Sequence, residues 1–483
     1  MQRLEQGDAT RAEIALRLAL AQCDDFGEAH ANLALLLERR GDVAAAERHY
    51  RRALALQPTH DGIWTNFGAC LERIGRCREA EHAHRSALAC NARSAAAWTN
   101  LGVVLEVLRR DDEAERCHRT ALELAPGWAH AEFNLAVLLL RRGRYDEGWR
   151  RFEARDWYRE HEARIGVPRW RGGSPQGLAI LIGIDSGHGD MIQFCRYAAV
   201  LKRRGATRVG VLCHPALTTL FERADGIDHV IAAGVPGTAV PDVAWDVWCP
   251  MLSLPHLCAT SASSIPAALP YLAPDPARVA RWAPRVDDGS RALRVGLAWK
   301  GNPRFAHDAQ RSLPSLRTLA PLGRLPGVRF YSLQKGAGED ETAAAPFALE
   351  PLGAAIDDFD DTAAILAGLD LLISVDTAAA HLAGALARPC WVLLPWHRLD
   401  WRWTREGDAT PWYPGVMRLF RQGPEGGWDA VVERVRDALA EWAGRSRPQA
   451  RATAAARCYL PARGAAENRR RRCRPAPPTR RGD

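Results

Sequence analysis

Several features that would assign this chain to a specialised class are missing from its 483 residues. Its twelve cysteines include no CxxC pair and no zinc-type spacing, so we expect no bound metal and reduced thiols in a cytoplasmic protein. The first twenty residues carry charges throughout and lack the apolar core of a signal peptide. No apolar run approaches the roughly 18 residues of a membrane-spanning helix. We therefore expect a protein without a membrane span.

A net positive charge is also missing once the C-terminal segment is set aside. The net charge is +8, but residues 445–483 hold 12 Arg against only Glu467 and Asp483, which leaves the rest of the chain near −2. This basic tail is rich in Arg, Ala and Pro, a composition that cannot bury enough apolar surface to fold. Two interpretations stay open: a disordered extension, or an electrostatic contact to RNA, DNA or anionic lipid. Elsewhere in the chain we expect no nucleic-acid binding.

A repeat with a period of 34 residues runs through residues 1–155. A glycine marks the turn between paired helices in most units, and Arg109 replaces it once. The residues that recur at this spacing are Asn32, Asn66, Asn100 and Asn134, then Ala53, Ala87 and Ala121, and the turn residues Gly41, Gly75 and Gly143. A helix-turn-helix period of 34 residues is the tetratricopeptide signature. We predict a helical solenoid with a half repeat at its start.

The four recurring asparagines have two interpretations. A mid-helix Asn is a poor helix former whose side chain needs a hydrogen-bond partner, which a neighbouring repeat can supply. Alternatively, the four side chains form a ladder on the concave face and bind the backbone of an extended peptide. The repeats would then recruit a protein or glycan acceptor.

The remainder of the chain follows an α/β pattern. Residues 156–177 lose the repeat and gain Pro and Gly, which indicates a linker. From residue 178, short apolar runs of strand length alternate with helical stretches, and the pattern restarts at residue 289. We predict two Rossmann-like units, 178–288 and 289–444, with a cleft between them. Ligands of open parallel sheets bind at the carboxyl ends of the strands.

The polar motifs at those strand ends resemble a known family. LAWKGNPRFAHDAQRSLP, YSLQKG and SVDTAAAHLAGALARPCWVLLPWHRLDWRW are similar to segments of the family 9 glycosyltransferases, which are related to bacterial heptosyltransferases. The likeness is greater to bacterial relatives that carry N-terminal tetratricopeptide repeats. The Asn ladder resembles that of the O-linked N-acetylglucosamine transferases. The resemblance implies a GT-B fold, a nucleotide-diphospho-sugar donor, inverting transfer and no cofactor or obligatory metal.

Asp376 and Thr377 end a predicted strand and precede a helix. The free N–H groups and positive dipole at the start of that helix are suited to a diphosphate. The resemblance implies that Asp376, Thr377 and His381 contact the donor. The alternative is an ordinary helix cap with His381 in the core.

Asp190 follows Gly187 and Gly189 in a turn after the first strand of the 178–288 unit. A carboxylate there can accept the proton of an attacking hydroxyl, and the resemblance makes Asp190 the candidate general base. Helix capping is its alternative role. The repeat-bearing relatives usually have EQGLGD where this chain has DSGHGD. This difference leaves open altered acceptor contacts or a loss of activity.

Further candidates follow other strands of the 289–444 unit. Lys300 or Arg311 can neutralise the charge of a leaving diphosphate, with solvated surface charge as the alternative. Gln334 and Lys335 can hold the base or the ribose. The aromatic segment 396–413 can stack on a sugar or base, or fill a gap between domains.

We therefore expect a glycosyltransferase whose repeats recruit the acceptor. The alternative is a scaffold for protein–protein interaction with a degenerate transferase fold.

Overall fold

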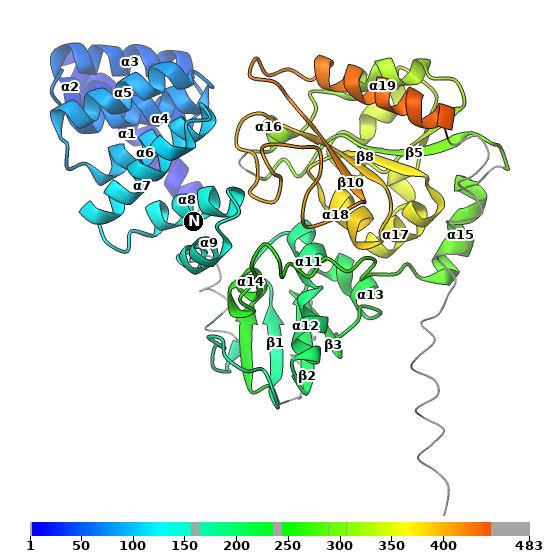
Figure 1. Ribbon diagram of the computed structural model, residues 1–483. Helices are drawn as coiled ribbons and strands as arrows, with labels where there is room; N and C mark the ends of the chain where they lie inside the picture. The colour runs from blue at the N-terminus through cyan, green and yellow to red at the C-terminus, as the bar shows by residue number, and fades with distance from the viewer. Residues whose placement is uncertain are drawn as a thin grey trace, which may run out of the picture.

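The computed structural model describes residues 2–155, 162, 165–234, 244–287, 289–305 and 307–445. A helical solenoid leads to a unit with a four-stranded sheet and then to one with a six-stranded sheet (Figure 1). The basic tail after residue 445 and most of 156–164 lie outside the described residues. In the described parts of the chain, no helix is both long and apolar enough to cross a membrane.

The solenoid consists of paired antiparallel helices, as the 34-residue period predicts. The alanines of the repeat pack where neighbouring helices approach, and Ala53, Ala87 and Ala121 are fully buried. A single helix, α1, precedes the first pair and corresponds to the predicted half repeat. The helices are α1 (Gln2–Gln22), α2 (Gly27–Arg39), α3 (Val43–Leu56), α4 (Asp61–Arg73), α5 (Cys77–Cys90), α6 (Ala95–Val107), α7 (Asp111–Leu124), α8 (Ala129–Arg141) and α9 (Tyr145–Phe152).

All strands described in the two α/β units are parallel, in the orders β3-β2-β1-β4 and β10-β9-β8-β5-β6-β7. The first unit contains β1 (Ala179–Gly183), α11 (His188–Phe194), α12 (Tyr197–Arg203), β2 (Arg208–Cys213), α13 (Thr218–Phe221), β3 (His229–Ala232), β4 (Val247–Pro250) and α14 (Leu254–Leu257). The second contains α15 (Pro276–Val286), β5 (Leu293–Ala298), α16 (Asp308–Arg311), β6 (Val328–Ser332), β7 (Leu349–Pro351), α17 (Phe359–Gly368), β8 (Leu371–Val375), α18 (Ala378–Ala385), β9 (Cys390–Leu394), β10 (Met417–Arg421) and α19 (Asp429–Arg445). The predicted solenoid followed by a parallel α/β region is therefore confirmed.

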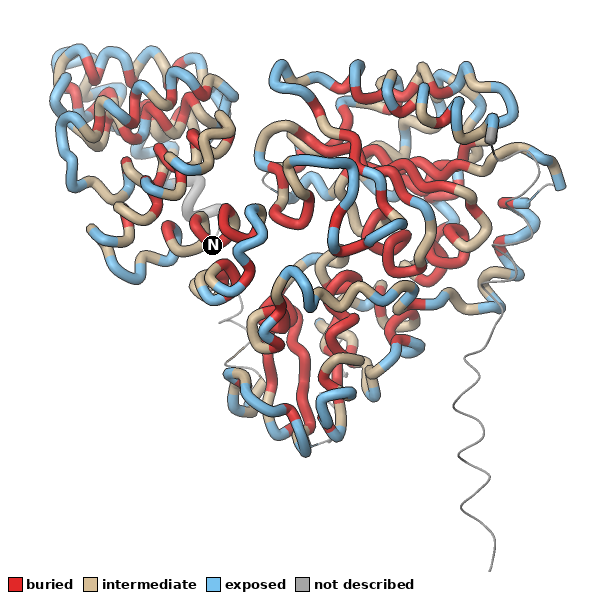
Figure 2. The backbone as a smooth tube through the Cα atoms, in the orientation of Figure 1, coloured by how far each residue is buried: buried red, intermediate tan, exposed pale blue. Residues whose placement is uncertain are grey.

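Helix α15 differs from the sequence-based division at residue 288. It packs against α17 of the second unit, and the Trp282 indole donates to the Asp361 carboxylate at 3.0 Å. By packing, the second unit thus begins before α15, because the helix buries Trp282 and Val286 there. In both units the buried residues are concentrated on the strands (Figure 2).

An aromatic junction joins the three parts of the chain. We give this name to Trp149 of α9, Phe194 of α11, and Trp401 and Trp412 of the loop between β9 and β10. The rings of Trp149 and Trp401 meet edge to face, with centroids 5.0 Å apart, and Phe194 lies 5.8 Å from Trp412. All four side chains are buried. The interpretation of Trp401 and Trp412 as a filling between domains is therefore the one observed.

The loop at 396–405 also contacts the solenoid through polar side chains. In two repeats a glutamate at the end of one helix pairs with an arginine 35 residues later: Glu38 with Arg73 at 2.7 Å, and Glu106 with Arg141 at 3.0 Å. The same spacing of 35 residues from Glu72 leads to position 107, where the chain has a valine in place of the arginine. Its partner is instead Arg398 of the loop, at 2.7 Å.

Arg109 marks a second departure from the repeat. It adopts φ +62° at the turn where Gly41, Gly75 and Gly143 have φ between +75° and +87°. This left-handed conformation costs a residue with a Cβ roughly 1–2 kcal/mol of conformational free energy. The Arg109 guanidinium lies 4.0 Å from the ring centroid of Trp396, so the substituted turn contacts the second α/β unit.

We predict that Trp149→Ala lowers the free energy of unfolding by about 3–5 kcal/mol, because it leaves a cavity at the aromatic junction. Denaturant titration followed by circular dichroism measures this loss. Phe305→Ala is the control, since that ring is 50% exposed and its removal should cost little. Equal stability of the two variants would contradict the importance of the junction.

Candidate functional site

The two α/β units meet where helices α11 and α18 pack against each other. Each helix follows the carboxyl end of a buried strand, β1 or β8. Gly189 makes the close packing possible, because a Cβ there would lie 2.9 Å from the His381 ring and 3.5 Å from Cα of Ala378. Asp190, the next residue, therefore lies beside the start of α18.

The Asp190 carboxylate has two partners. It accepts a hydrogen bond from the Gly187 amide at 3.2 Å, and it forms an ion pair with the Arg402 guanidinium. Burial raises the pKa of Asp190, the Arg402 charge opposes this shift, and the Asp400 charge adds to it. The side chain keeps 28% of its surface exposed, so a ligand can reach it.

Arg402 connects the residues of this site. Its guanidinium donates to both oxygens of Asp400 at 3.0 Å and to Oε1 of Gln193 at 2.5 Å, besides pairing with Asp190. Burial alone would lower the pKa of Arg402, but the charges of Asp400 and Asp190 raise it, so the side chain stays charged. Sequence reasoning grouped Arg402 only with the aromatic segment. No local signal could have revealed the pair, because 212 positions separate Arg402 from Asp190.

Asp376 and His381 lie on the other side of the same site. Burial and the charge of Asp400 raise the pKa of Asp376 to about 6. Burial and the charge of Arg402 hold the pKa of His381 well below its usual range, so the ring is neutral at neutral pH. The His381 ring stacks on Trp403 and shares a 2.9 Å hydrogen bond with the Tyr413 hydroxyl.

The start of α18 is open to a ligand. The Thr377 hydroxyl interacts with Ser374 at 2.8 Å and does not cap its own helix. Among the described residues, no group accepts a hydrogen bond from the amides of Ala378 and Ala379. Such amides at a helix N-terminus can bind an anion.

The three cationic candidates, Arg311, Lys300 and Lys335, differ in whether their charge lies near Asp376. Arg311 lies close enough to Asp376 for its charge to oppose the raised pKa of that residue. Lys300 instead pairs with Glu341 at 2.6 Å, and Lys335 donates to the Ile356 carbonyl. The structure thus brings Arg311, but not the ammonium of Lys300 or Lys335, toward Asp376.

Gln334 has a structural role that the sequence did not indicate. Its oxygen accepts from the amides of Trp299 and Lys300, and its nitrogen donates to the carbonyls of Lys300 and Ala337, at 2.8–3.1 Å. These four bonds use the whole capacity of the side-chain amide. Gln334 lines a cavity of about 530 Å³ together with Gly336 and Glu339.

The repeat asparagines are on the solenoid surface. Asn32 and Asn66 are exposed, and Asn100 and Asn134 are half-buried. Asn134 contacts His130 of its own helix at 3.4 Å. In the described residues we find no hydrogen bond from any of the four side chains to a neighbouring repeat.

The altered residues of the DSGHGD turn also have contacts. Asp185 is buried and pairs with Arg155, the residue that ends the solenoid region, at 2.9 Å. His188 packs against His214 with ring centroids 4.4 Å apart, and burial lowers the pKa of His188 to about 4. Asp185 therefore ties the solenoid to the first α/β unit.

Comparisons with known proteins identify the repeats. A family model of the tetratricopeptide repeat matches residues 27–60. The chain therefore carries tetratricopeptide repeats, and repeats of this kind suggest protein–protein interaction.

The comparisons also find individual similar proteins. Protein FlbA of Caulobacter vibrioides is 32% identical over 327 residues, which are 62% of this chain and 53% of FlbA. The chain thus spans about half the length of this curated relative. Among solved structures, Pseudomonas aeruginosa PilF matches 31% of this chain and 69% of its own at 24% identity, with a TM-score of 0.30. MamA matches 34% of this chain and 96% of its own at 21% identity, with a TM-score of 0.29.

We predict that Asp376→Asn stabilises the protein at neutral pH. The folded-state pKa of about 6 exceeds the ordinary 3.8, so the folded state binds this proton more tightly than the unfolded state. Stability therefore falls as the pH rises through this window, and the buried charge costs on the order of 1–3 kcal/mol above it.

The variant should melt at a higher temperature than the wild type above about pH 7, and the difference should vanish below about pH 4. Thermal unfolding at both pH values measures this. Asp25→Asn, at a carboxylate that is 76% exposed, should show no such pH-dependent gain. A lower melting temperature of Asp376→Asn at neutral pH would show that its charge is stabilising.

Proposed function

We propose that this chain is a glycosyltransferase that moves a sugar from a nucleotide-diphospho-sugar to an acceptor hydroxyl, with inversion and without a metal. The observation that carries the proposal is the packing of α11 on α18, which brings Asp190 beside the open N-terminus of α18. Direct sugar transfer requires a base and a seat for the leaving diphosphate at this short separation. The resemblance of the same segments to the family 9 glycosyltransferases supports this reaction.

In the proposed reaction, the acceptor oxygen attacks the anomeric carbon and passes its proton to the Asp190 carboxylate. The bond between the anomeric carbon and the diphosphate oxygen breaks as the new glycosidic bond forms. The raised pKa of Asp190 makes the carboxylate a better proton acceptor than an exposed aspartate. Arg402 holds this carboxylate in position.

The leaving diphosphate would bind the amides of Ala378 and Ala379 and the charge of Arg311. These groups stabilise negative charge as it develops, the task that a metal performs in other transferases. His381, held neutral by its surroundings, can contact the donor without adding charge. The cavity of about 530 Å³ beside Gln334 offers space for the nucleotide base. The Gln334 amide holds the surrounding loops through hydrogen bonds to their backbone and would not contact the base itself.

A second candidate function is a scaffold whose α/β region has lost catalysis. The observation that favours it is the engagement of Asp190 by both Gly187 and Arg402, which is also how a structural carboxylate is held. The altered DSGHGD turn agrees with this alternative. The repeats would then act through protein–protein interaction alone.

We predict that Asp190→Asn abolishes transfer but not donor binding. The amide keeps the shape of the side chain and cannot accept the proton, so turnover should fall by about 10²–10⁴-fold. The nucleotide affinity, measured by calorimetry, should change by no more than about threefold, because the base does not hold the diphosphate. Sugar-nucleotide hydrolysis or transfer measures turnover.

Asp287→Asn is the matched control, because this carboxylate is 50% exposed and pairs with Arg294 away from the helices that meet at Asp190. Full activity of Asp190→Asn would remove Asp190 as the base. Nucleotide affinity without turnover in the wild type would favour the scaffold, and no affinity for any common sugar nucleotide would refute the glycosyltransferase.

We further predict that replacing Asn66, Asn100 and Asn134 together by Ala weakens acceptor binding. The three side chains form no hydrogen bond to a neighbouring repeat, so their loss should leave the fold intact while removing contacts to an acceptor backbone. The KM for a protein acceptor should rise by about tenfold, with the nucleotide affinity unchanged. Unchanged use of the acceptor would contradict the ladder.

A further inference from the structure

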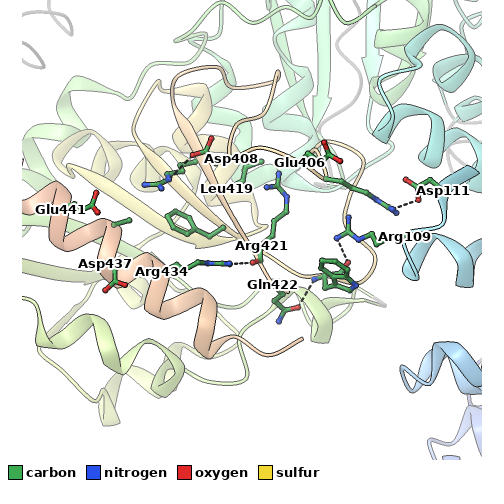
Figure 3. Close-up of a pocket in the computed structure, with 15 residues that line it drawn as sticks. Arg109, Asp111, Glu406, Asp408, Leu419, Arg421, Gln422, Arg434, Asp437 and Glu441 are labelled. Carbon is green, nitrogen blue, oxygen red and sulfur yellow. Dashed lines mark hydrogen bonds and ion pairs between the residues drawn. The ribbon is translucent and has the colours of Figure 1, made fainter. Parts of the chain in front are cut away.

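A second cavity lies apart from the helices α11 and α18, on the side of the second α/β unit that faces the solenoid. Its volume is about 800 Å³, and its walls come from the turn between α6 and α7, the outermost strand β10, and helix α19. In Figure 3, Arg421 lies between Arg109 on the solenoid side and Arg434 on α19. Asp437 and Glu441 lie farther along α19.

Among the described residues, three guanidiniums at this cavity donate hydrogen bonds only to uncharged oxygens. Arg109 donates to the Trp396 carbonyl at 3.4 Å. Arg421 donates to the Thr404 hydroxyl at 3.2 Å and to the Gly407 carbonyl, and Arg434 donates to the carbonyl of Arg421. Within the described part of the chain, none of the three pairs with a carboxylate.

The positive charge of these guanidiniums is therefore poorly balanced. Burial and the nearby charge of Arg109 lower the pKa of Arg421 to about 10. Burial and the charge of Arg141 lower the pKa of Arg109 as well. Like charges held together in a partly buried place favour the binding of an anion.

Four carboxylates at the cavity pair with other arginines or lie at its rim, although the charges of Asp111 and Asp408 also act on Arg109 and Arg421. Asp111 pairs with Arg405 at 2.5 Å, and Asp408 lies 3.4 Å from Arg418. Asp437 pairs with Arg436 at 2.6 Å. Glu406 is exposed at the rim. The solenoid end of the cavity thus holds Arg109 beside the ion pair of Asp111 and Arg405 and carries a net positive charge, whereas further acidic groups line the α19 end and the rim.

Arg109, at the solenoid end of the cavity, occupies a position where the other repeats have glycine. Glycine would occupy this left-handed turn without strain, as it does in the other three repeats. When a residue other than glycine occupies a strained backbone conformation, its side chain often has a function. Contact with Trp396 is one use, and an anion in the cavity is a second.

We propose that this cavity binds an acidic peptide segment of a protein partner held by the repeats. Arg109, Arg421 and Arg434 would each bind a carboxylate of the segment. Guanidinium groups spread over three structural elements match carboxylates spaced along an extended chain better than a single small anion. The cavity begins at a turn of the solenoid, so one partner can contact both surfaces. This proposal does not depend on glycosyl transfer.

Fluorescence anisotropy of a fluorescein-labelled hexaglutamate peptide with the full chain tests this proposal. Arg421→Gln and Arg109→Gly should each weaken binding by about tenfold, because each removes a charge-assisted contact. Arg109→Gly restores the glycine of the other repeats, so its melting temperature should be no lower than that of the wild type. Arg85→Gln is the control, since this half-exposed arginine pairs with Glu81 on the solenoid away from the cavity.

All variants keep the basic tail, so a difference between them reports on the cavity alone. Equal affinity of Arg421→Gln, Arg109→Gly and Arg85→Gln would overturn the proposal. Competition by inorganic phosphate at concentrations as low as those of the unlabelled peptide would refute a peptide site. Tighter binding of hexathymidylate through the same arginines would assign the cavity to nucleic acid and would equally refute the proposal.

Discussion

Burial of the indoles of Trp149, Trp401 and Trp412 at one junction holds the solenoid and both α/β units together. Trp149 belongs to the last repeat helix, and Phe194, which contacts the other rings, belongs to α11 of the first unit. Exposing such rings costs several kcal/mol each, about 3–5 in comparable substitutions. Separation of any part from the others is therefore unfavourable. Arg402, which pairs with Asp190, lies 4.3 Å from the ring centroid of Trp401 in this junction.

The loop that carries the junction residues connects two surfaces. Toward the solenoid, Arg398 pairs with Glu72 and Arg405 pairs with Asp111. Toward the α/β units, Arg402 holds Asp190 and Asp400. Residues 396–405 of this loop thus contact the repeats and also position the Asp190 carboxylate of the candidate site. A partner bound on the solenoid would lie within reach of this loop, which gives the fusion of repeats and α/β region a physical meaning.

Much of the architecture could be predicted because its signals are local. The 34-residue period located the helix pairs, and the apolar runs located the strands of both sheets, although β7 and β10 were not foreseen. Individual site residues were harder. Gln334 was proposed to hold a base or ribose, yet its amide is fully used by backbone groups of Trp299 and Lys300, about 35 positions away, and of nearby Ala337. Lys300 was a plausible partner for a diphosphate, yet it pairs with Glu341.

The sequence by itself determined the repeating helices and the alternation of strands and helices, because the spacing of small and apolar residues decides which face each element buries. It also marked one exception to the repeat, Arg109, without indicating its use. Only the tertiary structure decided that Arg109 and Glu72 contact the loop at 396–405, and that Arg402 meets Asp190. The physical reason is that such contacts join residues up to 326 positions apart, and the packing of whole units brings them together.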